Sequence, residues 1–167
     1  MPLFESVIRA LNASGTRYLV VGGLATVLHG HARMTADIDV IVDLEPTAAL
    51  SAMKALTSMG LVPRPPVSAA SFADPELRRS WAKDKGMRVF SLWDPANPML
   101  EVDVFIEHPI PFDELMARSL EIEALGMRIP VVSIEDLIAL KRLADRPQDR
   151  EDIRALETIA RAKTKGA

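Results

Sequence analysis

The alternation of apolar and polar residues divides the first part of the chain into segments with two different periods. Residues 3–13 and 46–60 repeat apolar side chains every three to four positions, which predicts helices that end near glycines. Residues 18–21 and 38–42 are short apolar runs typical of buried strands. A short helix is expected between these strands, beginning at two glycines and ending by Gly30.

The middle of the chain contains a second pair of strand-like runs. Residues 87–94 and 99–107 alternate or run apolar and flank a turn with two prolines, so we expect an antiparallel pair. Residues 63–80 contain four prolines and few large apolar groups. This stretch predicts an irregular, mobile excursion with one short helix beginning at Pro75.

The last part of the pattern is mainly helical. A helical turn at residues 112–119 and a hairpin around Gly126 precede a helix that begins at Ser133 and a final helix at residues 147–162. The order of elements predicts an α/β (α+β) fold in which helices pack on a mixed, largely antiparallel sheet. We expect one domain over residues 1–167, with its core at about 18–132 and a C-terminal helical part at 133–162.

Composition narrows the function classes. The 167 residues include no cysteine, which excludes disulfides, thiolate nucleophiles and cysteine-ligated metals and suits a reducing compartment. No signal sequence and no apolar run of about 18 residues is evident, so we expect a soluble, cytoplasmic protein with no membrane partner. The net charge of −3 predicts no broad basic surface for nucleic acid. A local cleft for an RNA end would draw on four basic residues, Arg64, Arg78, Arg79 and Lys83.

Acidic residues interrupt the strand-like runs. Asp37 and Asp39 are two residues apart, so a strand places both carboxylates on one face, and Asp103 on a later strand shares a face with Glu101. Such acids repel one another unless a cation lies between them, and hard carboxylate oxygens are ligands for Mg²⁺. Taken alone, a pair of acids is also compatible with a solvated strand face, and Gly22-Gly23 with an ordinary turn.

The combination of these motifs resembles a known family. VGG at 21–23, Arg33, Thr35, DIDV at 37–40 and VDV at 102–104 resemble the nucleotidyltransferase superfamily of DNA polymerase beta. GGLATVLHGHARMTADIDV is most similar to small bacterial nucleotidyltransferases related to AbiEii-type toxins, and LIALKRLADRPQDREDI at 137–153 is similar to their helical segment. The chain is shorter than the usual AbiEii-type toxin, so we expect no separate C-terminal domain for the acceptor.

The resemblance implies a role for each matching residue. Asp37, Asp39 and Asp103 would be catalytic and bind two Mg²⁺ ions, or Mn²⁺ in their place, with Asp103 also a candidate base toward the acceptor hydroxyl. The residues implied for nucleotide binding are Gly22, Gly23, Arg33, Thr35, Lys141 and Arg146. The implied partners are a nucleoside triphosphate such as ATP, an acceptor that is RNA, protein or a small molecule, and an antitoxin-like protein.

Several residues keep a second interpretation. Arg33 pairs with either Asp37 or a phosphate, and Thr35 is expected to bond locally to the backbone. Asp149 and Asp152 are expected to cap the last helix or to neutralise its positive end rather than to act in catalysis. Glu101 is the rival of Asp103 as third ligand. Side chains with a weaker claim to a metal or a nucleobase are His29, His31, Trp81 and Trp93.

Three functions follow from these residues. The favoured one is a Mg²⁺-dependent nucleotidyltransferase that transfers a nucleoside monophosphate to a hydroxyl acceptor and releases pyrophosphate. The second is a non-catalytic relative that binds a nucleotide or a partner, as part of a toxin–antitoxin pair. The third is a metal-dependent hydrolase that uses the same acids. Retention of three mutually repelling carboxylates favours activity.

Overall fold

A computed structural model of the protein describes residues 2–166. Its helices are α1 (Pro2–Ala13), α2 (Gly22–Leu28), α3 (Pro46–Thr57), α4 (Pro75–Lys85), α5 (Phe112–Arg118), α6 (Ile134–Ala144) and α7 (Pro147–Gly166). Its strands are β1 (Tyr18–Val21), β2 (Asp37–Val42), β3 (Val62–Pro63), β4 (Val89–Asp94), β5 (Asn97–Phe105), β6 (Leu120–Ala124) and β7 (Met127–Val131). No helix within residues 2–166 is long and apolar enough to cross a membrane.

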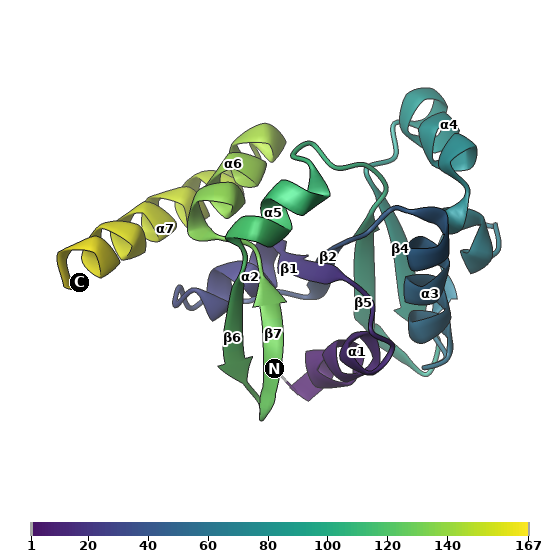
Figure 1. The fold of residues 1–167 in the computed structure, drawn as a ribbon, viewed down its shortest axis with the longest axis horizontal. Helices are drawn as coiled ribbons and strands as arrows, with labels where there is room; N and C mark the ends of the chain where they lie inside the picture. Colours follow the sequence, from purple (N-terminus) through teal and green to yellow (C-terminus); the bar gives the residue numbers. More distant parts are fainter. Residues whose placement is uncertain (1, 167) are drawn as a thin grey trace.

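The strands form one mixed sheet in the order β3-β4-β5-β2-β1-β7-β6 (Figure 1). β2 pairs with β5 and β1 with β7 in parallel, whereas the other four neighbouring pairs are antiparallel. The predicted fold, a largely antiparallel mixed sheet with helices packed on it, is therefore confirmed. The parallel pairing of β2 with β5 brings together strands about 60 residues apart in sequence.

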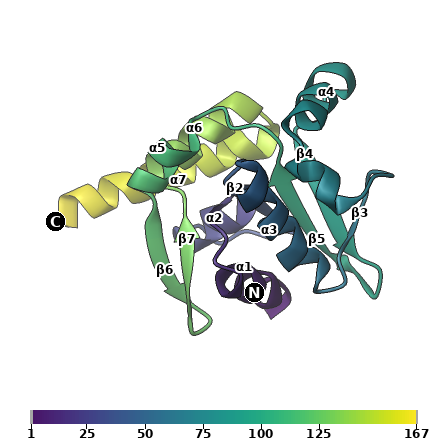
Figure 2. The same cartoon turned by 45° about the vertical axis from the view of Figure 1, so that its right-hand side comes forward.

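Successive side chains of the central strands point alternately to a buried face and to a half-exposed face of the sheet. Ile38, Val40, Val102 and Val104 point into the core and are fully buried. Each contributes about 1.5–3 kcal/mol of hydrophobic free energy relative to an exposed side chain. Helices α1 and α3 lie side by side. Helices α6 and α7 form a separate pair, from which the C-terminus projects (Figures 1 and 2). The half-exposed face of β2, β4 and β5 carries the polar residues.

The stretch at residues 63–80 has more structure than predicted. A 3₁₀ helix (Ala69–Ala73) precedes α4, and the Asp74 carboxylate accepts hydrogen bonds from two backbone amides in the first turn of α4. Phe72 is fully buried and packs edge-on against Phe90 of β4 at 5.5 Å between ring centroids. One aromatic side chain and one helix cap therefore anchor a proline-rich segment whose pattern alone indicated an irregular excursion.

Candidate active site

Four carboxylates share the half-exposed face where β2 and β5 run side by side. In the parallel register Asp37 lies opposite Glu101, and Asp39 lies opposite Asp103. The structure therefore brings together the three acids predicted as a site, with Glu101 beside them. Parallel pairing of two acid-x-acid motifs in this register concentrates four negative charges in a small area of sheet.

The electrostatic cost of this arrangement is visible in the acids themselves. Burial and the charge of Asp103 raise the pKa of Asp39 from 3.8 to about 6. Burial, followed by the charge of Glu101, raises the pKa of Asp37, and burial is also the main cause of the raised pKa of Asp103. Each shift means that the charged form is destabilised in the folded protein. A cation at this point would reverse that effect.

The two glycines after β1 are required because the acid strand packs against them. Gly22 has a positive φ of 63°, and a Cβ there would lie 1.9 Å from Oδ2 of Asp39. A Cβ on Gly23 would lie 2.5 Å from Oγ1 of Thr35. The backbone amide of Gly23 donates a hydrogen bond to the Asp39 carboxylate. The glycine turn thus holds Asp39 directly. The sequence had suggested only a phosphate-binding role for these two glycines.

A buried network of charges connects α6 and α7 to the loop before β2. Nζ of Lys141 lies 2.7 Å from Oδ2 of Asp152 and 3.4 Å from Oδ1 of Asp149. Nη1 of Arg33 lies 2.5 Å from Oδ2 of Asp152, and Nε of Arg146 lies 2.8 Å from Oδ2 of Asp149. The side chains of Lys141, Asp149 and Asp152 are almost completely buried. The cations predicted to meet the nucleotide are therefore paired with carboxylates of α7.

This network revises two sequence-based interpretations. Arg33 pairs with Asp152 of α7, 119 residues away, rather than with Asp37. Asp149 does accept the backbone amide of Arg146 at 3.1 Å, as expected for a residue that caps α7, but Asp152 is held in buried ion pairs instead of a cap. The expected local bond of Thr35 is present, because its hydroxyl donates to the backbone oxygen of Asp37 at 3.3 Å.

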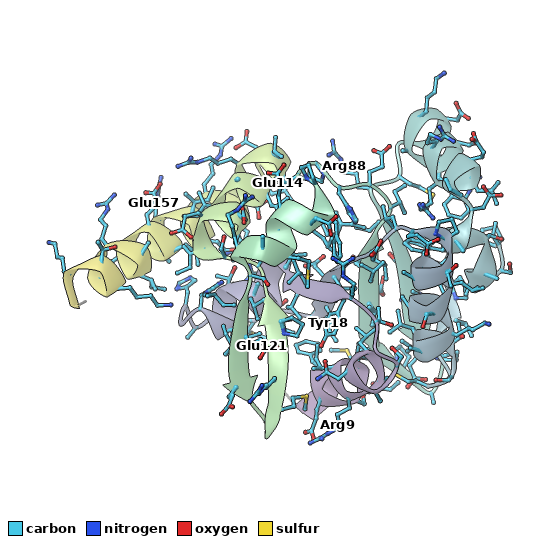
Figure 3. All side chains as sticks on the ribbon, in the orientation of Figure 1. Arg9, Tyr18, Arg88, Glu114, Glu121 and Glu157 are labelled. Atoms are coloured by element: carbon cyan, nitrogen blue, oxygen red, sulfur yellow. The ribbon has the colours of Figure 1, made fainter. Side chains whose placement is uncertain are left out.

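A cleft of about 620 Å³ opens beside Asp39 and Asp103. Gly22, Lys141, Arg146 and Asp149 line it near the acids. Apolar side chains of β5, the following loop and α6 form another wall: Phe105, Pro109, Leu137, Leu140, Leu143 and Ala144. Arg88, just before β4 and labelled in Figure 3, also lines the cleft. The cleft therefore joins an acidic pair, a cationic group and an apolar wall.

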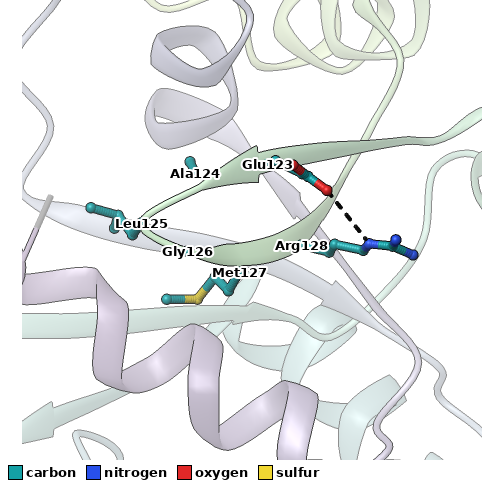
Figure 4. Close-up of a pocket in the computed structure, with 6 residues that line it drawn as sticks. All are labelled: Glu123, Ala124, Leu125, Gly126, Met127 and Arg128. Atoms are coloured by element: carbon teal, nitrogen blue, oxygen red, sulfur yellow. Dashed lines mark ion pairs between the residues drawn. The ribbon is translucent and has the colours of Figure 1, made fainter.

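A second hollow lies far from this chemistry. It has a volume of about 480 Å³ and is formed by six consecutive residues at the tip of the β6–β7 hairpin, Glu123 to Arg128 (Figure 4). Nε of Arg128 lies 3.8 Å from a carboxylate oxygen of Glu123 across the hairpin. The hairpin itself was predicted around Gly126, and its turn contains no carboxylate pair or buried cation that would give it a catalytic role.

Two side chains that contact the acids of β5, Ser91 of β4 and Arg64 just after β3, were not predicted from the sequence. The hydroxyl of Ser91 on β4 donates to Oδ1 of Asp103 at 2.5 Å. Nη2 of Arg64 lies 2.7 Å from Oε2 of Glu101, and its guanidinium lies 4.5 Å from the centre of the Trp93 ring. The alternation of side chains along a strand places Ser91 and Trp93 on one face of β4. Their partners on β5 depend on the register of the two strands, which the sequence does not reveal.

Other candidate residues have structural roles. His29 is buried, and its Nε2 lies 2.8 Å from the backbone oxygen of Val132. Trp81 is buried and stacks on Phe90, so it is not available to a nucleobase. Arg78 is buried and donates to the backbone oxygens of Phe72 and Leu44. Arg78 therefore does not contribute to an RNA-binding surface.

Within residues 2–166, no three His, Asp or Glu side chains converge closely enough to enclose a metal ion by themselves. The donor set nevertheless suits Mg²⁺, because Asp37, Asp39 and Asp103 provide hard oxygens on rigid strands. Burial, and after it the charge of a neighbouring acid, raises the pKa of each of the three, so a cation at this face would stabilise their charged forms. Metal bound at this face would need further oxygen ligands, such as water or phosphate, to complete its coordination.

Comparisons with solved structures find nucleotidyltransferase folds. The lincosamide antibiotic adenylyltransferase LnuA, solved with lincomycin, is 16% identical, with a TM-score of 0.62 over 95% of this chain and 97% of its own. ANT(2")-Ia in complex with adenylyl-2"-tobramycin is 14% identical, with a TM-score of 0.60 over 99% and 98%. A putative nucleotidyltransferase from Thermotoga maritima is 16% identical, with a TM-score of 0.59 over 94% and 91%. These likenesses show the fold.

The sequence itself identifies the family. A search of curated proteins finds no match. The model of the family described as nucleotidyl transferase AbiEii toxin, type IV toxin–antitoxin system, matches residues 8–156, a range that contains the glycine turn, all four acids and the charge network. The resemblance drawn from the motifs is thereby confirmed, and the chain belongs to the AbiEii family of nucleotidyltransferases.

Proposed function

We propose that the protein uses Mg²⁺ to transfer a nucleoside monophosphate from a nucleoside triphosphate to a hydroxyl acceptor, with release of pyrophosphate. The observation that carries this proposal is the pairing of Asp39 with Asp103 on adjacent parallel strands, directly beside Gly22 and the cleft. Burial is the main cause of the raised pKa of both carboxyl groups, so their charged forms are destabilised in the metal-free protein and a bound cation would stabilise them.

The metal would be held by Asp37, Asp39 and Asp103. When bound, Mg²⁺ supplies positive charge that offsets the charge on the attacking and leaving oxygens. The acceptor oxygen forms a bond to the α-phosphorus, and the bond from that phosphorus to the bridging oxygen of the β-phosphate breaks. The hydroxyl proton passes to a carboxylate oxygen of Asp103, which acts as the general base.

The triphosphate would lie along the part of the cleft bounded by Gly22, Gly23 and the α6–α7 charge network. That network contains three cations, Arg33, Lys141 and Arg146, but two carboxylates, so one positive charge remains uncompensated. We assign these cations, with Thr35, to orienting the triphosphate. Because Lys141 is buried and paired, it would act on the phosphates mainly through its field rather than by direct contact.

The acceptor is proposed to be a small hydroxylated molecule, RNA or protein. An extended RNA surface is the least supported of these, because Arg64 and Arg78 are already engaged within the protein. The two antibiotic-modifying neighbours were solved with lincomycin and with adenylyl-2"-tobramycin, which supports a small hydroxylated acceptor. From the type IV toxin–antitoxin family we also propose an antitoxin-like protein partner.

Transfer of label tests this proposal. The protein would be incubated with each of the four α-³²P-labelled nucleoside triphosphates and Mg²⁺, together with total RNA, cell protein or a metabolite extract. We expect one of these pools to gain label with wild type, and to gain none with Asp39→Asn. Absence of label in every pool, or equal labelling by Asp39→Asn, would contradict the proposed chemistry.

A further inference from the structure

The two acids of β5 are held in different ways by the strands beside them. Glu101 is bound to Arg64, whose guanidinium is stacked over Trp93. Asp103 instead accepts the hydroxyl of Ser91. One acid is therefore engaged by a full positive charge at the edge of the sheet, whereas the other is held by a neutral donor that leaves its negative charge available to a metal.

Ser91 is well placed to fix the orientation of the Asp103 carboxylate. The two residues are directly opposite in the antiparallel β4–β5 register, so the contact bridges adjacent strands. Ser91 Oγ is 2.5 Å from Oδ1 of Asp103, and no donor within residues 2–166 contacts Oδ2. A single short side chain on a rigid strand thus binds one oxygen of Asp103, a residue that also lines the cleft.

Repulsion from the neighbouring acid makes this contact necessary. Asp39 lies opposite Asp103 on β2, and without a restraint the two carboxylates would turn away from one another in the metal-free protein. Side chains that hydrogen-bond to metal ligands typically change metal affinity 10- to 100-fold when removed, because they fix the ligand in its binding orientation.

We propose that Ser91 is a positioning residue that orients Asp103 for the metal–nucleotide complex, while Arg64 keeps Glu101 out of that complex. The proposal rests on the proposed nucleotidyl transfer and goes beyond it by naming the strand contact that selects which acid of β5 serves. Ser91 does not touch substrate; it acts through Asp103.

Measurement of Mn²⁺ binding tests this role. The binding would be monitored by electron paramagnetic resonance in the presence of a non-hydrolysable triphosphate analogue. Ser91→Ala should weaken Mn²⁺ binding about tenfold, whereas Ser91→Thr, which keeps the hydroxyl on a strand-favouring residue, should bind within about threefold of wild type. Ser80→Ala is the matched control, since Ser80 makes a similar bond to Asp84 at 3.0 Å on α4, outside the acidic face. It should bind like wild type.

The outcomes separate the inference from the proposed function. Wild-type affinity in Ser91→Ala would overturn the role of Ser91 while leaving nucleotidyl transfer intact. Equal loss in Ser91→Thr and Ser91→Ala would also overturn it, because the hydroxyl would not then be the cause. A wild-type protein that binds no Mn²⁺ with any triphosphate analogue would overturn the proposed function, and this inference with it.

Discussion

Replacement of Asp39 by asparagine should stabilise the metal-free protein. The folded-state pKa of Asp39 is about 6, whereas its ordinary value is 3.8. Between these values the folded protein binds the proton more tightly than the unfolded chain does. Stability therefore rises as pH falls from 6 toward 3.8, and at pH above 6 the charged carboxylate destabilises the fold. Asparagine removes this penalty and can still accept the Gly23 amide.

The size of the effect follows from the same shift. About two pKa units correspond to roughly 3 kcal/mol. This is an upper value, because the Asp39 side chain is only partly buried and the remaining contact with solvent screens part of the repulsion. For a chain of this length, 1 kcal/mol moves the melting temperature by roughly 2–4 °C. Asp39→Asn should therefore melt up to about 10 °C above wild type at pH 7.5.

Calorimetry in the presence of a chelator, at pH 7.5 and again at pH 4, measures this effect. The stabilisation should be present at pH 7.5 and nearly lost at pH 4, where the wild-type carboxyl is protonated. A lower melting temperature for Asp39→Asn at pH 7.5 would refute the electrostatic reasoning. So would an equal increase at both pH values, because that increase could not come from the ionised carboxylate.

Three further changes test other parts of the structure. Lys141→Met removes the buried cation that Asp149 and Asp152 share and should cost about 3 kcal/mol in urea unfolding, part of which Asp152→Asn in the same chain should restore. Gly22→Ala should cost at least twice the roughly 1 kcal/mol of Gly15→Ala, because both have positive φ but only the first meets an acid side chain. Burial lowers the pKa of His108 from 6.5 to about 4, so stability should fall by up to roughly 3 kcal/mol between pH 6.5 and 4, and His108→Gln should flatten that slope.

The acidic face could be predicted from the sequence because it depends on local geometry. A strand fixes the relation between Asp37 and Asp39, and the turn residues before it fix the position of the glycines. The approach of Asp103 to Asp39 needed the family pattern, since no local rule sets which strands pair. The relative positions of residues that are two or three places apart in the sequence could therefore be predicted from the sequence.

The contacts that were missed depend on distant parts of the chain. Arg33 and Asp152 are 119 residues apart, and their pairing requires α7 to fold back over α6 and reach the loop before β2. Likewise, Ser91 meets Asp103 only because β4 and β5 adopt one particular register, and a shift of one residue would turn the hydroxyl to the other face. Sequence periodicity predicts which face a side chain occupies, but not which side chain lies opposite.

The central claim is that the carboxylates of β2 and β5 bind a metal–nucleotide complex. Isothermal titration of each nucleoside triphosphate, with and without Mg²⁺, tests it most directly when wild type is compared with Asp103→Asn and Glu101→Gln. We expect Mg²⁺-dependent binding to wild type, at least tenfold weaker binding to Asp103→Asn, and nearly unchanged binding to Glu101→Gln. Binding that is independent of Mg²⁺, or that is unaffected by Asp103→Asn, would contradict the account.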